Sequence, residues 1–173
     1  MTSRLAIPAI YTDGQLIDAD HMNTYVRTNL SSIDSGYGCR VATTTSQDIT
    51  PTDTWTALSF NAETFDDDTM HDNSTNNSRI TIKSAGRYLV TGSALYTANN
   101  GSGNRMAAIY VNGSLYSYGS SRIAGSATNV ELLTICDVIV LAVNDYVQFF
   151  VQHTNTTNTL PVGRRHFSVT KYV

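Results

Sequence analysis

The sequence has little charge and no basic excess. Asp, Glu, Lys and Arg make up 14% of the 173 residues, and the formal net charge is -3 at pH 7. Without a positive field the chain is a poor partner for nucleic acid, whose phosphates attract basic surfaces. Thr, Ser and Asn are frequent instead. These polar residues suit turns and the solvent-facing sides of strands, so the composition favours a β-rich globular protein.

Long apolar runs are also missing. No stretch approaches the roughly 20 apolar residues that a membrane-spanning helix needs, so we expect no membrane partner. Residues 1–14, MTSRLAIPAIYTDG, contain no basic region followed by a continuous apolar run, which is the pattern of a secretory signal. We therefore expect the chain to be made in the cytoplasm and not to be inserted into a membrane.

Cysteine is scarce, and the usual motifs of catalysis are absent. Cys39 and Cys136 would pair only if the fold brought their Cα atoms within about 7 Å, and we expect both thiols to be free. The histidines are scattered, and no nucleophile elbow, zinc-protease helix or phosphate-binding glycine loop is present. We predict that the protein is not an enzyme and carries no cofactor.

One acidic segment is the densest cluster of potential metal ligands. It contains Asp66, Asp67, Asp68, His71 and Asp72. Several carboxylates in one loop are compatible with Ca²⁺, which takes about six to eight oxygen ligands. The segment lacks the glycine and the alternate-residue ligands of a dedicated calcium loop. The alternative is that the Asp side chains cap turns by accepting backbone hydrogen bonds, and we predict no metal site.

From Cys39 onward the hydrophobic pattern has the period of two that is typical of strands. Asn112-Gly113 between two apolar runs predicts a hairpin, because both residues tolerate the positive φ of a tight turn. Eight or nine strands separated by short turns favour an antiparallel sandwich. The expected strands are Arg40–Thr45, Trp55–Phe60, Arg79–Lys83, Arg87–Tyr96, Arg105–Val111, Ser114–Tyr118, Asn129–Val140, Tyr146–His153 and Arg164–Tyr172.

The first 38 residues differ from the rest and predict an anchoring segment. Leu5, Ile7 and Ile10 lie in an extended arm that cannot bury these side chains by itself. Residues 18–33 predict a helix with an Asp18 cap, whose apolar stripe is formed by Met22, Val26, Leu30 and Ile33. This helix either packs on its own domain or serves as a docking or trimerising helix. We expect residues 1–38 to anchor the chain and residues 39–173 to form the folded domain.

Two features point to contacts with other molecules. The strand from Asn129 to Val140 is nearly all apolar, more than one buried face requires, which suggests oligomerisation.

The aromatic residues divide into two groups. Trp55, Phe60, Tyr88 and Tyr96 are expected in the core. Tyr116 and Tyr118, on a hairpin, are expected either to form a contact patch or to stack on a surface glycan.

Seven segments of the domain follow one another in the order of a known family, and they are residues 65–72, 78–82, 85–90, 104–105, 109–113, 141–147 and 166–169. With these segments the domain resembles the complement component 1q-like domain of the tumour-necrosis-factor-like superfamily. The resemblance implies a ten-stranded jelly roll in a tight trimer. It places Phe167, Val169 and Tyr172 of the last strand near the three-fold axis, together with Phe149. Asn144 stands where the family usually has Gly, and Asn can adopt the same turn conformation.

Residues 12–30 resemble a segment found at the start of many tailed-phage virion proteins. Together the two resemblances suggest a trimeric capsid decoration (cement) protein or short head fibre, made in the host cytoplasm and located in the virion. Its anchoring segment would bind the major capsid protein or another virion protein. The alternative is a tail-fibre or tail-tip module that binds a host receptor or a surface glycan, since fold does not determine function.

Overall fold

The computed structural model describes residues 20, 37–50, 53–97, 103–123, 130–155 and 159–172, with the side chains of residues 120–123 left aside. Within these ranges the chain forms eleven strands. They are β1 (Gly38–Thr43), β2 (Gln47–Ile49), β3 (Thr56–Ala57), β4 (Ala62–Asp66), β5 (Arg79–Thr81), β6 (Gly86–Tyr96), β7 (Gly103–Val111), β8 (Ser114–Ile123), β9 (Glu131–Leu141), β10 (Tyr146–His153) and β11 (Leu160–Tyr172). No helix in the described residues is long and apolar enough to cross a membrane.

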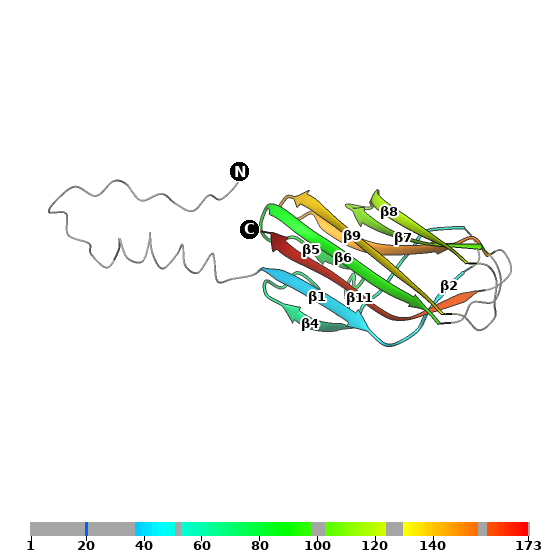
Figure 1. The fold of residues 1–173 in the computed structure, drawn as a ribbon. Coiled ribbons are helices and arrows are strands. Elements are labelled where there is room, and N and C mark those ends of the chain that lie inside the picture. Colours follow the sequence, from blue (N-terminus) through cyan, green and yellow to red (C-terminus); the bar gives the residue numbers. More distant parts are fainter. Residues whose placement is uncertain are drawn as a thin grey trace.

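The strands form two antiparallel sheets that pack face to face (Figure 1). The first sheet has the order β4-β1-β11-β6-β9, with β2 also paired to β11. The second has the order β3-β10-β7-β8, with β5 also paired to β10. The predicted all-β antiparallel sandwich is therefore confirmed. Strands that are distant in the sequence, such as β1 and β11, lie side by side.

Two tight turns meet at one end of the sandwich. Asn112 and Gly113 have φ values of 52° and 78°, which confirms the predicted hairpin between β7 and β8. Asn144, with φ 71°, adopts the left-handed conformation expected for it. The Asn112 side chain joins the two turns, because its amide donates to Asp145 Oδ1 at 2.8 Å and its oxygen accepts from Tyr146 N at 2.9 Å.

The core between the sheets is centred on three stacked phenylalanines. The Phe167 ring lies 6.2 Å from the Phe60 ring and 5.8 Å from the Phe149 ring, at small interplanar angles of 19° and 17°. Gly92 lies beneath Phe149, and a Cβ atom there would come within 3.1 Å of the ring. This close approach explains why β6 carries a glycine at its centre.

Arg165 is a buried cation that joins several loops to β11. Its side chain is nearly inaccessible. The guanidinium donates to four main-chain carbonyl oxygens, those of Ser59 (3.0 Å), Thr45 (2.8 Å), Val162 (3.1 Å) and Gly163 (3.1 Å). Burial lowers the pKa of Arg165 to about 10, which leaves it charged at neutral pH. The bonds to Val162 and Gly163 satisfy carbonyl groups at the register shift between β11 and β6, and those to Ser59 and Thr45 fix neighbouring loops.

The strand boundaries differ from the predictions at several places. β2 and β4 were not expected, and β4 is exposed along most of its length, so it shows no alternation of buried and exposed residues. The predicted strand Trp55–Phe60 is reduced to the two residues of β3. Phe60, Tyr88 and Tyr96 are in the core as predicted, whereas Trp55 is only half-buried. Cys39 and Cys136 are both free, as expected.

Candidate functional site

One face of the first sheet exposes large apolar side chains. On β9, the exposed fractions are 59% for Leu132, 54% for Val138 and 75% for Val140. Leu89 of β6 is paired with Val138 and is also exposed. Buried Leu133, Ile139 and Leu141 occupy the opposite face of β9. Both faces of this strand are therefore apolar, in agreement with the pattern read from the sequence. We call Leu89, Leu132, Val138 and Val140 the apolar face.

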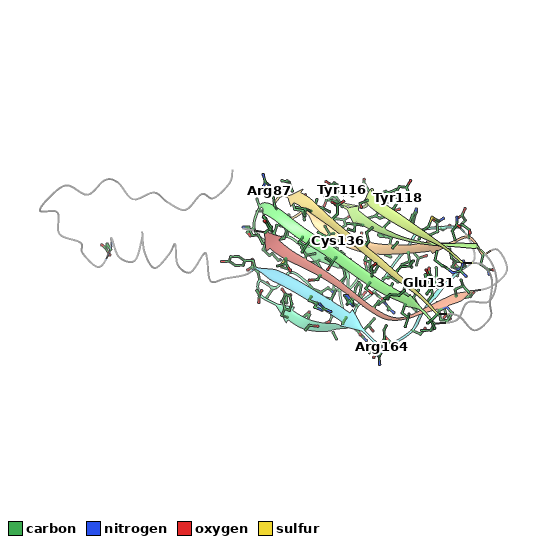
Figure 2. The ribbon with its side chains drawn as sticks, in the orientation of Figure 1. Arg87, Tyr116, Tyr118, Glu131, Cys136 and Arg164 are labelled. Atoms are coloured by element: carbon green, nitrogen blue, oxygen red, sulfur yellow. The ribbon has the colours of Figure 1, made fainter. Side chains whose placement is uncertain are left out.

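A second group of exposed apolar side chains lies on β8, the edge strand of the other sheet. Leu115, Tyr116 and Tyr118 are 47%, 54% and 66% exposed. β8 and β9 contact each other, so this group and the apolar face lie on adjoining sides of the sandwich. Figure 2 shows Tyr116 and Tyr118 pointing away from the molecule along this side, with Cys136 on neighbouring β9. We call Leu115, Tyr116 and Tyr118 the β8 edge.

Three of the four residues predicted at the trimer axis require correction. Phe149, Phe167 and Val169 have no exposed surface, because they fill the space between the two sheets. They offer no side-chain surface to a second copy of the chain. Tyr172 is 65% exposed, and it is paired with Arg87, which is itself paired with Val140 at the end of the apolar face. Only Tyr172 remains available for the predicted contact.

The predicted anchoring residues lie outside the described residues. They are Leu5, Ile7, Ile10, Met22, Val26 and Leu30. Asp20, within the predicted helix, is helical and exposed. β1 begins at Gly38, next to the predicted boundary between the anchoring segment and the folded domain.

The acidic segment organises its own loop. Asp66 accepts hydrogen bonds from the backbone amides of Met70 (2.8 Å) and His71 (3.0 Å). Asp72 Oδ1 accepts from the amides of Ser74 (2.8 Å) and Thr75 (2.9 Å). Hydrogen bonds to these amides lower the pKa of Asp72 to about 2. The interpretation of Asp66 and Asp72 as turn-capping residues is confirmed. Among the described residues no group of three His, Cys, Asp or Glu side chains is placed to hold a metal ion.

A pocket with a volume of about 390 Å³ lies between this loop and β5. Its lining includes two cations, Arg79 and Lys83, and the hydroxyl groups of Thr69, Thr75 and Thr81. The sequence predicted a strand at Arg79–Lys83 but did not single out its side chains as a site. The signal was present, because Arg79, Thr81 and Lys83 alternate with buried Ile80 and Ile82.

His153 and Arg105 form a buried polar pair at the other end of the sandwich. His153 Nε2 is 2.9 Å from the carbonyl oxygen of Ile49, and Arg105 lies over the Tyr96 ring at 5.7 Å. Burial, with a smaller effect from Arg105, lowers the pKa of His153. The imidazole is therefore favoured in its neutral form, which suits a structural role within the core.

The strand order and the two facing antiparallel sheets define a jelly-roll sandwich of the C1q and TNF type. The globular domain of zebrafish complement 1qA superposes with a TM-score of 0.57 at 12% identity, covering 80% of this chain and 98% of that one. Eiger TNF from S. frugiperda superposes with a TM-score of 0.58 at 7% identity, covering 80% and 93%. At these identities the likeness establishes the fold.

Sequence comparisons give no closer relationship. No family model matches the chain. No curated protein matches it either.

Proposed function

We propose that this chain is a non-enzymatic, self-associating structural protein of a tailed-phage virion. In this proposal it forms a trimeric capsid decoration protein or a short head fibre, and residues 1–38 bind the major capsid protein or another virion protein. The observation that carries the self-association is the apolar face, whose β9 side chains are between 54% and 75% exposed. The likeness of residues 12–30 to phage virion proteins supports the location.

The arrangement of exposed apolar side chains favours a ring over a two-fold dimer. A two-fold dimer uses the same patch on both copies, whereas a closed ring joins two different patches of each copy. The apolar face and the β8 edge are two such patches on adjoining sides of one chain. Packing the β8 edge of one copy on the apolar face of the next repeats around a three-fold axis. Each large apolar side chain buried in this way contributes about 1.5–3 kcal/mol.

The self-association is tested by Val138→Lys. Val138 is in the centre of the apolar face and its substitution leaves the core intact, so we expect a folded chain that no longer associates. Light scattering coupled to size exclusion measures the mass, and circular dichroism checks the fold. Val143→Lys is the matched control, because Val143 is 51% exposed in the turn after β9. It should retain the trimer mass. A monomeric parent chain, or a trimeric Val138→Lys variant, contradicts the assignment.

The anchoring role is tested by capsid binding. We expect a chain that lacks residues 1–34 to keep its trimer mass but to bind empty capsids at least about ten-fold more weakly, because three weak contacts act together in the full assembly. Sedimentation with empty capsids measures the binding. Equal binding by the truncated and full chains would rule out the anchor.

The copy number of the chain in an intact particle separates decoration from the alternative, a tail-fibre or tail-tip module that binds a receptor. Hundreds of copies indicate decoration, and a handful indicate the tail.

A further inference from the structure

The pocket beside β5 has a net positive lining. Arg79 and Thr81 project from the same face of β5, since Ile80 between them is buried, and Lys83, two residues beyond the strand, also lines the pocket. Neither Arg79 nor Lys83 is paired with a carboxylate of the described residues. Two cations held near each other without counter-ions repel, and an anionic ligand placed between them relieves this repulsion.

The acidic groups nearest the pocket are already engaged. Asp72 lines the pocket, but its Oδ1 atom accepts three hydrogen bonds, from Ser74 N, Ser74 Oγ and Thr75 N, at 2.8 to 2.9 Å. His71, also in the lining, contacts Glu63 with Nδ1 at 3.1 Å and the Asn77 carbonyl with Nε2 at 3.2 Å. These contacts hold Asp72 Oδ1 and the His71 ring within the loop, and the lining as a whole keeps two cations against one carboxylate.

An aromatic surface continues from the pocket across the outer face of the second sheet. The Arg79 guanidinium lies 5.0 Å above the Tyr146 ring, and Arg79, Gln148 and Tyr110 are neighbours in one cross-strand row. A guanidinium stacked in this way keeps its N–H edge free to bind a carboxylate through two hydrogen bonds.

Two further half-buried rings, Phe150 and Trp55, extend this surface beyond Tyr110. Tyr110 stacks on Phe150 with ring centroids 3.9 Å apart. The only tryptophan, Trp55, contacts the edge of Tyr110 at 6.2 Å. Trp55, which was predicted in the core, therefore lies with these rings on the outer face of the sheet. Side chains of this kind offer an apolar face and a polar edge to a ligand that has both characters.

We propose that this surface binds an acidic saccharide. The carboxylate or ester anion of the sugar occupies the pocket between Arg79 and Lys83, and the apolar C–H faces of neighbouring sugar rings lie on the aromatic row. The Gln148 amide nitrogen donates to Ser78 Oγ at 3.0 Å, which leaves its Oε1 atom and the threonine hydroxyls to bond sugar hydroxyls. All of these residues belong to one chain, so the site does not depend on the self-association proposed above.

The experiment uses the full chain and three probes. Oligogalacturonate carries a carboxylate on every ring, a dextran oligomer of the same length carries none, and inorganic sulfate supplies an anion without a sugar. Titration calorimetry measures binding, and Trp55 fluorescence reports contact with the aromatic row. We expect saturable binding of oligogalacturonate with a change in Trp55 emission. Dextran is expected to bind at least about ten-fold more weakly, since it lacks the charge-assisted hydrogen bonds.

The matched variants are Arg79→Gln and Arg164→Gln. Both variants remove one cation. Arg79 lines the pocket beside β5 in the second sheet, whereas Arg164 is exposed on β11 in the first sheet and is not part of the lining (Figure 2). Arg79→Gln should weaken oligogalacturonate binding roughly ten-fold or more, and Arg164→Gln should leave it unchanged. The proposal is overturned by absent oligogalacturonate binding or by equal loss in both variants. It is also overturned if dextran binds equally well, or if sulfate alone reproduces both the affinity and the Trp55 response.

Discussion

Replacing Arg165 by alanine is expected to lower the free energy of unfolding by about 3–5 kcal/mol, because several buried carbonyl oxygens lose their donor at about 1–3 kcal/mol each. The substitution leaves four main-chain carbonyl oxygens without their donor and opens a cavity beside Phe60, whose ring lies 5.9 Å from the guanidinium. Urea unfolding followed by circular dichroism, at one fixed protein concentration, measures the change.

The neighbouring residue provides the control. Arg164 is exposed, so Arg164→Ala should change the unfolding free energy by no more than about 0.5 kcal/mol. Similar losses for the two variants would show that the total charge of β11, and not the buried hydrogen bonds of Arg165, determines the effect.

The second large effect is expected for Phe167→Ala, which should also cost about 3–5 kcal/mol. Phe167 is in the middle of the three-ring stack and has no exposed surface. Its removal leaves a cavity between Phe60 and Phe149 that the surrounding strands cannot close. Urea unfolding at fixed protein concentration measures the loss, as for Arg165.

Phe65→Ala is a suitable comparison, since Phe65 is 40% exposed on edge strand β4 and should cost less. If Phe167→Ala left the midpoint of unfolding unchanged and only abolished association, Phe167 would belong to an interface between chains after all.

The alternation of apolar and polar residues with a period of two was sufficient to predict most of the long strands. It located the long strands, and Asn112-Gly113 placed the β7–β8 hairpin correctly. β4 was missed because an exposed edge strand needs no alternating side chains. β2 was missed because its three residues pair with β11 near Pro161, a residue that argues locally against a strand.

The site was harder to predict than the fold, for a physical reason. Alternation shows that Phe167 and Val169 share one face of their strand, but both a second sheet and a second copy of the chain can cover such a face. The packing of the two sheets decides this, and it buries these residues within one chain. The pocket at Arg79 depends on a loop shape that Asp66 and Asp72 impose through backbone hydrogen bonds. Such loop geometry leaves no periodic pattern.

The pairing of β1 with β11 places the two ends of the described domain next to each other. Gly38 is opposite Thr170, and Lys171 N donates to the Tyr37 carbonyl oxygen at 2.8 Å. A peptide tag fused after β11 would therefore emerge at the same end of the domain as the start of β1. A cargo intended for the opposite end of the domain needs an internal insertion there, since Thr43 is paired with Arg165 at the other end of the ladder. The fold thus favours internal insertion over terminal fusion for displaying a peptide there.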